Sequence, residues 1–170
     1  MLNQTITNLL NQQINKELYS SYLYLDMSNY YSDKNLNGFA NWFSIQSLEE
    51  HAHGMLILKY LQNNSEKVIL NPIAAPDKIY TEFKQPLEAS WEHELFISAS
   101  IDDIYAQAYS LKDFRTMQFL DWFVKEQGEE EKKADELNKR FDLFAGDARG
   151  LYLLDAELAT RTYKAPSLEV

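Results

Sequence analysis

Several acidic side chains and one histidine occupy positions of this sequence where the hydrophobic pattern calls for apolar residues. They come from four separate stretches of the chain, and the set comprises Glu17, Glu50, His53, Glu94, Glu126 and Glu130. Each is in phase with a stripe of apolar residues of helical period, so each is expected to point toward the core of a helical bundle. Burying carboxylates together is prohibitive unless a cation neutralises them. The pattern therefore predicts a metal site inside the bundle.

Spacing places the first group of these side chains at one level. Glu50 and His53 are three residues apart, so they share one helix face. The polar segment 32–35 is predicted to join two antiparallel helices, and the midpoint between Glu17 and Glu50 falls inside it. Residues equidistant from such a turn lie at the same level of a hairpin, so these two carboxylates should face each other.

Glu94, Glu126 and Glu130 show the same relation in the second predicted hairpin. The midpoint between Glu94 and Glu126 and the midpoint between Glu94 and Glu130 both lie close to a break in the pattern at 112–113, so either Glu126 or Glu130 could face Glu94. The alternative interpretation is that these acidic residues are solvated surface charges. It would require acidic residues on all four helices to be in phase with the apolar stripe by chance. Carboxylates with one imidazole form an oxygen-rich site that suits iron, manganese or, less well, zinc.

The elements that carry these residues are four long helices and a short fifth. The amphipathic pattern predicts helices over about 3–32, 36–63, 86–112 and 113–144, and an apolar one over about 151–160. The segment 63–83 has prolines and no sustained period, so it should be a long crossover connection. This all-α arrangement is the ferritin-like variant of the four-helix bundle. We expect one domain over residues 1–160 and a frayed tail over 161–170.

Composition excludes several classes of protein. The net charge of −10 argues against nucleic acid as a partner. The absence of cysteine excludes disulfides, zinc–thiolate sites and cysteine-ligated iron–sulfur clusters. No apolar run approaches the length of a membrane span, and no membrane partner is expected. The N-terminus lacks the basic and apolar regions of a signal peptide, so a cytoplasmic location is expected.

Short stretches of the sequence resemble those of bacterial non-haem ferritins, and the resemblance extends over about residues 1–160. These stretches are 15–21 (NKELYSS), 49–53 (EEHAH), 93–94 (HE), 126–132 (EQGEEEK) and 150–152. The resemblance implies an iron position at Glu17, Glu50 and His53, and a second at Glu50, Glu94 and either Glu126 or Glu130. A third is implied at Glu49, Glu126, Glu129 and Glu130. Tyr24 and Gln127 match residues beside this centre, and Trp122 lies near it.

The activity that the resemblance implies is ferroxidation. Two Fe²⁺ ions would be oxidised by O₂ or H₂O₂, and the Fe³⁺ product stored as a mineral inside a hollow shell of twenty-four subunits. The fifth helix lines the fourfold axes of such shells. Its apolar surface, which such an interface requires, would come from Leu151, Leu153, Leu154 and Leu158, although the same residues could instead dock on their own subunit.

No haem is expected. The haem-bearing relatives, the bacterioferritins, carry a second Glu-x-x-His pair on the fourth helix, where this sequence has Gln127 and Glu130. Their haem-ligating methionine follows the glutamate of the first pair directly, and His51 stands at that position here.

Three other functions compete with this interpretation. A passive store would accumulate iron without oxidising it rapidly, but a non-catalytic subunit is expected to lose Glu50, His53 and Glu94. A di-metal oxidase acting on an organic substrate would need a substrate pocket and usually two Glu-x-x-His pairs. A purely structural bundle would show no metal dependence of its stability, whereas buried carboxylates should gain stability from metal.

Overall fold

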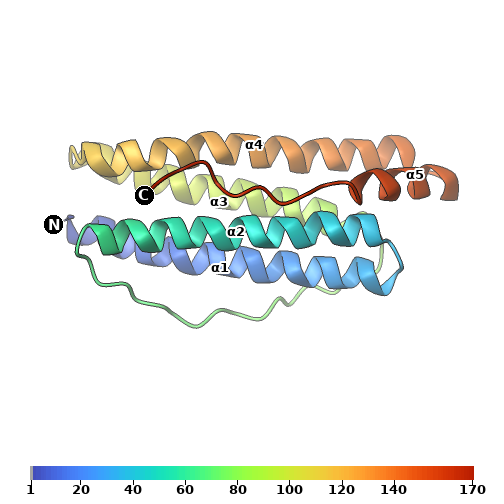
Figure 1. Ribbon diagram of the computed structural model, residues 1–170, viewed down its shortest axis with the longest axis horizontal. Helices are drawn as coiled ribbons and strands as arrows, with labels where there is room; N and C mark the ends of the chain where they lie inside the picture. The colour runs from blue at the N-terminus through green and yellow to red at the C-terminus, as the bar shows by residue number, and fades with distance from the viewer. Residues whose placement is uncertain (1) are drawn as a thin grey trace.

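The computed structural model describes residues 2–170, and these residues form five α-helices (Figure 1). The helices are α1 (Gln4–Asp33), α2 (Asn37–Asn63), α3 (Gln85–Ser110), α4 (Phe114–Phe144) and α5 (Ala148–Leu158). The hairpin of α1 and α2 packs on the hairpin of α3 and α4, and the connection 64–84 runs along the outside of the first hairpin. The predicted fold, two helical hairpins with one long crossover and a short fifth helix, is confirmed.

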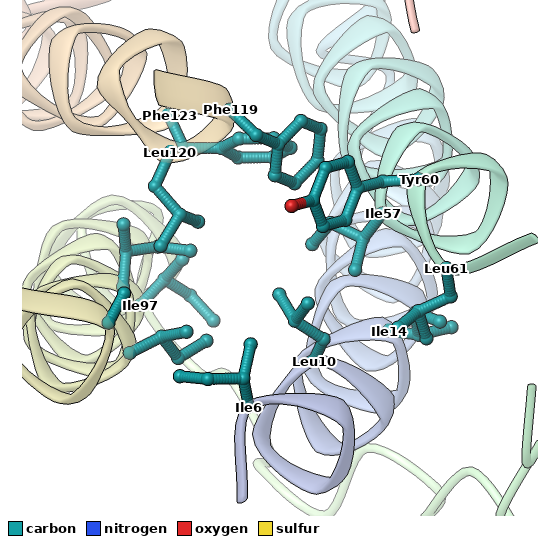
Figure 2. Packing of buried hydrophobic residues seen from close by; sticks show 13 residues of the cluster. Ile6, Leu10, Ile14, Ile57, Tyr60, Leu61, Ile97, Phe119, Leu120 and Phe123 are labelled. Carbon is teal, nitrogen blue, oxygen red and sulfur yellow. The ribbon is translucent and has the colours of Figure 1, made fainter. Parts of the chain in front are cut away.

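The core consists of two apolar clusters with a polar layer between them. One cluster joins the first half of α1 to the second half of α2, and includes Ile6, Leu10 and Ile57. Figure 2 shows this cluster, in which the ring of Tyr60 stacks on that of Phe119 with centroids 4.0 Å apart. The other cluster occupies the opposite end of the bundle. Because apolar packing holds both ends, the polar side chains between them are fixed at mid-length of all four helices.

The fifth helix docks on its own subunit. Leu154 and Leu158 are buried against the bundle, whereas Tyr152 and Leu153 are 71% and 57% exposed. Two of the four leucines that the sequence assigned to a subunit interface, Leu154 and Leu158, are therefore used within the subunit. None of the helices in residues 2–170 is both long and apolar enough to cross a membrane.

An aspartate of α5 caps the start of α2. Leu36, at the N-cap position of α2, offers no side-chain hydrogen bond. Asp155 Oδ1 instead accepts hydrogen bonds from the backbone N–H groups of Gly38, at 2.8 Å, and Phe39, at 3.0 Å. These amides are among those that a helix leaves unpaired at its first turn. Because α2 receives its cap from α5, the two helices are fixed relative to each other.

The segment 161–170, predicted to fray, lies back along the groove between α2 and α4 (Figure 1). The Arg161 Nη1 group donates to the Trp42 carbonyl at 3.1 Å, and Trp122 Nε1 donates to Ser167 Oγ at 3.1 Å. Leu168 and Val170 pack against the cluster of Figure 2. Partners on two helices thus hold a segment that has no helical period of its own.

Candidate metal centre

Five buried side chains from the four long helices meet in the polar layer. One group consists of Glu17, Glu50 and His53, and a second of Glu50, Glu94 and Glu130. Within each group, one donor atom per residue lies within 4.8 Å of the others. Glu50 belongs to both groups. The structure therefore forms two adjacent potential metal positions that share one carboxylate. The spacing in the sequence predicted that these side chains meet, and the resemblance implied that Glu50 is shared.

Buried glutamines hold one oxygen of two of these carboxylates. Gln13 Nε2 donates to Glu17 Oε1 at 2.8 Å, and Gln46 Nε2 donates to Glu50 Oε1 at 2.8 Å. Glu17 Oε2 is buried and has no partner within residues 2–170, and Glu50 Oε2 has only the contact with His53 Nδ1, at 3.4 Å. A buried carboxylate oxygen without a partner is costly, and a bound cation removes that cost. The residues present thus fit metal binding.

Tyr24 and Gln127, the two non-ligand residues predicted beside the centre, both contact Glu94. The Tyr24 hydroxyl donates to Glu94 Oε1, and Gln127 Nε2 donates to Glu94 Oε2 at 3.2 Å. Lys133 Nζ lies 2.7 Å from Glu130 Oε1. The carboxylates of α3 and α4 are therefore oriented by neighbours, as those of α1 and α2 are by glutamines.

The electrostatics of the layer favour retention of protons in the absence of metal. Burial, and then the charge of Glu50, raise the pKa of Glu17 to about 8 and the pKa of Glu94 well above its usual range. Burial alone would lower the pKa of His53, but the hydrogen bond and charge of Glu50 raise it to about 10. A metal ion entering the centre must displace these protons.

Three of the predicted ligands lie outside both groups. Glu49 accepts a hydrogen bond from Arg161 Nη2 at 2.5 Å, Glu126 is half-buried, and Glu129 is exposed. With His53 they line a cavity of about 550 Å³ that the segment after α5 covers. The structure therefore brings Glu130, and not Glu126, to Glu94, and places Glu49, Glu126 and Glu129 around the neighbouring cavity.

The sequence profile of the Ferritin family, described as a ferritin-like domain, matches residues 7–144. The chain belongs to the ferritin family. It is 33% identical over 165 residues to a probable bacterial non-heme ferritin-like protein of Haemophilus influenzae, covering 97% of this chain and 100% of that protein. It is 34% identical over 155 residues to a bacterial non-heme ferritin of Campylobacter jejuni, covering 91% and 93%.

Solved structures agree with this assignment to the ferritin family. An open pore ferritin from the archaeon Archaeoglobus fulgidus superimposes with a TM-score of 0.93 at 34% identity, covering 95% of this chain and 100% of that one. An engineered closed form of the same ferritin gives a TM-score of 0.94, with coverage of 96% and 100%. The whole bundle, including α5, is thus shared with solved ferritins.

Four residues that contact the centre or its immediate neighbours were not given a role by the sequence, namely Gln13, Gln46, Lys133 and Arg161. Gln13 and Gln46 each precede a ligand by four residues on the same helix, and this spacing is a signal that could have identified them. Arg161 offers no such signal. Trp122, placed near the centre by the sequence, has its ring edge-on to His53 with centroids 5.5 Å apart.

Proposed function

We propose that this chain stores iron and oxidises Fe²⁺ to Fe³⁺ at the buried centre. One observation carries the proposal: two groups of buried ligands share Glu50, and Glu17 keeps one buried oxygen without a partner within residues 2–170. Such a centre holds two metal ions side by side. Anionic oxygen ligands stabilise Fe³⁺ more than Fe²⁺, so the ligand set itself favours oxidation.

The reaction needs two ions because each Fe²⁺ gives up a single electron. With O₂ as the oxidant, two Fe²⁺ and two protons yield two Fe³⁺ and one H₂O₂. With H₂O₂ as the oxidant, two Fe²⁺ and two protons yield two Fe³⁺ and two H₂O. Glu17, Glu50, His53, Glu94 and Glu130 would hold the iron, and Tyr24 and Gln127 would orient Glu94.

The cavity beside the centre supports ions, not an apolar organic molecule, as the substrate. Its lining includes the charged side chains of Glu49, Glu126, Glu129, Lys133 and Arg161. Pockets for organic substrates are lined mainly by apolar side chains. This observation favours ferroxidation over the alternative of a di-metal oxidase acting on an organic substrate. Glu49, Glu126 and Glu129 are also the residues at which we propose a third iron ion binds beside Glu130.

Assembly into a hollow shell of twenty-four subunits is part of the same proposal. Large apolar side chains are exposed at two regions of the single subunit. The connection 64–84 exposes Ile69, Leu70, Ile73 and Ile79, and the end of the bundle near α5 exposes Leu143, Phe144, Tyr152 and Leu153. Large apolar side chains that are exposed in a single subunit are candidates for burial between subunits.

The experiment that tests the ferroxidase proposal compares initial rates of Fe²⁺ oxidation in air for the wild type and for Glu50→Ala. Replacing a residue that only orients a ligand typically costs 10–100-fold, so loss of the shared ligand should lower the rate by at least about 100-fold. Glu92→Ala is the matched control because it removes an exposed carboxylate on α3. The ferroxidase proposal is contradicted if the wild type oxidises Fe²⁺ no faster than buffer alone, or if Glu50→Ala and the wild type have equal rates. Passive storage or a structural bundle would then be the remaining interpretations.

A further inference from the structure

Arg161, at the start of the segment 161–170, contacts two residues beside the metal centre, Gln46 and Glu49. Its Nη2 donates to Glu49 Oε2 at 2.5 Å and to Gln46 Oε1 at 3.0 Å, and its Nη1 donates to the Trp42 carbonyl at 3.1 Å. The guanidinium carbon lies 4.6 Å from the centroid of the Trp42 ring. The side chain is only 17% exposed. A planar guanidinium with this many partners occupies one defined position.

The first consequence concerns Glu49. Its side chain is 15% exposed and already has a cation as its partner, the guanidinium of Arg161. The cavity beside it is lined also by Glu126 and Glu129. A metal ion that binds Glu49 there competes with the Arg161 guanidinium for the charge of this carboxylate.

The second consequence concerns Gln46. Its Oε1 accepts from Arg161, so its Nε2 faces the centre and donates to Glu50 Oε1 at 2.8 Å and Glu130 Oε2 at 2.7 Å. A reversed amide would place its oxygen against two carboxylates and its NH₂ group against a cation. Arg161 thus fixes the orientation in which Gln46 holds two carboxylates of the centre, one of them the shared Glu50.

We propose that Arg161 couples the metal position at Glu49 to the buried centre, because one guanidinium both competes for Glu49 and positions Glu50 and Glu130 through Gln46. The proposal rests on the proposed metal centre. A metal ion at Glu49 releases Arg161 and, with it, the amide of Gln46. Occupation of the outer position therefore loosens the buried centre, and the segment after α5 is the link between the two. Arg161 is a positioning residue, since it does not itself contact the iron.

The test is calorimetric titration with Fe²⁺ in the absence of O₂, on the assembled wild type and on Arg161→Ala. Loss of an outer partner of metal ligands should weaken binding of the two buried ions by about tenfold. Removal of the competing cation, which makes one charge-assisted hydrogen bond to Glu49, should tighten binding of the third ion by about tenfold. The two changes have opposite signs, whereas general damage to the fold would weaken both.

Two further variants complete the test. Arg149→Ala removes an exposed cation of α5 that does not line the cavity, and should leave both affinities unchanged. Arg161→Lys keeps a charge beside Glu49 and should return the third affinity to within about threefold of the wild type, since a cation again competes there. The coupling is overturned if Arg161→Ala changes both affinities in the same direction, or changes neither of them. It is also overturned if Arg161→Lys binds the third ion as tightly as Arg161→Ala does. A wild type that binds no tight pair of Fe²⁺ ions would instead overturn the proposed function.

Discussion

Glu50 illustrates how one residue can serve two metal positions. Its Oε1 is held by the neutral amide of Gln46, and its Oε2 lies 3.4 Å from His53 Nδ1. Burial would raise the pKa of Glu50, but the hydrogen bond and charge of His53 lower it below its usual range. The shared carboxylate is therefore ionised while Glu17 and Glu94 keep their protons. The negative charge of the Glu50 carboxylate therefore attracts a cation to the centre while its neighbours are still protonated.

The metal-free protein should lose stability as the pH rises from 6.5 to 8. The pKa values of Glu17, about 8, and His53, about 10, in the folded chain lie above the ordinary values of 4.5 and 6.5. The folded chain therefore binds more protons than the unfolded chain in this window, and stability falls with rising pH. The pKa of His93, lowered by burial to about 4, has the opposite effect, but mainly between pH 4 and 6.5, and little of it extends to pH 8. We expect a loss of at least about 1 kcal/mol, measured by denaturant unfolding of chelator-treated protein at both pH values.

Metal should reverse this trend, because its ligands must be deprotonated. The stabilisation that Zn²⁺ gives should therefore grow between pH 6.5 and 8. Glu17→Gln is the matched variant, since it cannot titrate but keeps the shape of the side chain, and its metal-free stability should depend less on pH. A metal-free wild type that becomes more stable from pH 6.5 to 8 would contradict the protonation of the centre.

At the scale of elements, the position of α5 depends on the absence of a side chain at one residue. A Cβ atom on Gly38 would lie 1.7 Å from the backbone oxygen of Asp155. Only glycine allows the α5 backbone to approach closely enough for the Asp155 carboxylate to cap α2. The docking of α5 also directs the chain that follows it toward the groove where Arg161 binds.

Gly38→Ala should destabilise the subunit by about 1–3 kcal/mol, because the added methyl group must displace α5. Gly128→Ala is the matched control, since a Cβ there meets no atom within 4 Å among residues 2–170. Alanine is the better helix former, so this second variant should gain about 1 kcal/mol. Thermal unfolding of both variants measures the difference. Equal effects of the two substitutions would show that the contact between α5 and α2 contributes nothing.

The sequence predicted the helices and most of the centre because both depend on periodicity. Glu17 and Glu50 were paired correctly, since their distances from the turn are equal. Glu126 and Glu130 could not be separated in this way, because residues four apart share a helix face. Burial separates them: Glu130 is buried and Glu126 is half-buried. The role of Arg161 was not predictable from periodicity, since its partners are more than a hundred residues away in the chain.

At the scale of the whole molecule, the subunit combines a net charge of −10 with large exposed apolar side chains. Like charges on the subunits oppose association, and burial of these apolar side chains would favour it. Two neighbouring leucines of α5 contribute to different contacts. Leu154 faces the bundle of its own subunit, and Leu153 faces outward.

Leu153→Glu should prevent assembly without unfolding the subunit, because it places a charge on an exposed apolar surface that a partner subunit would bury. Sedimentation should show species smaller than the shell, while circular dichroism keeps its helical signal. Leu154→Ala is the contrasting variant. It creates a cavity beneath α5 and should cost about 2–5 kcal/mol of stability, seen as a lower unfolding temperature. If Leu153→Glu forms shells of unchanged size, the outward face of α5 does not contribute to the interface.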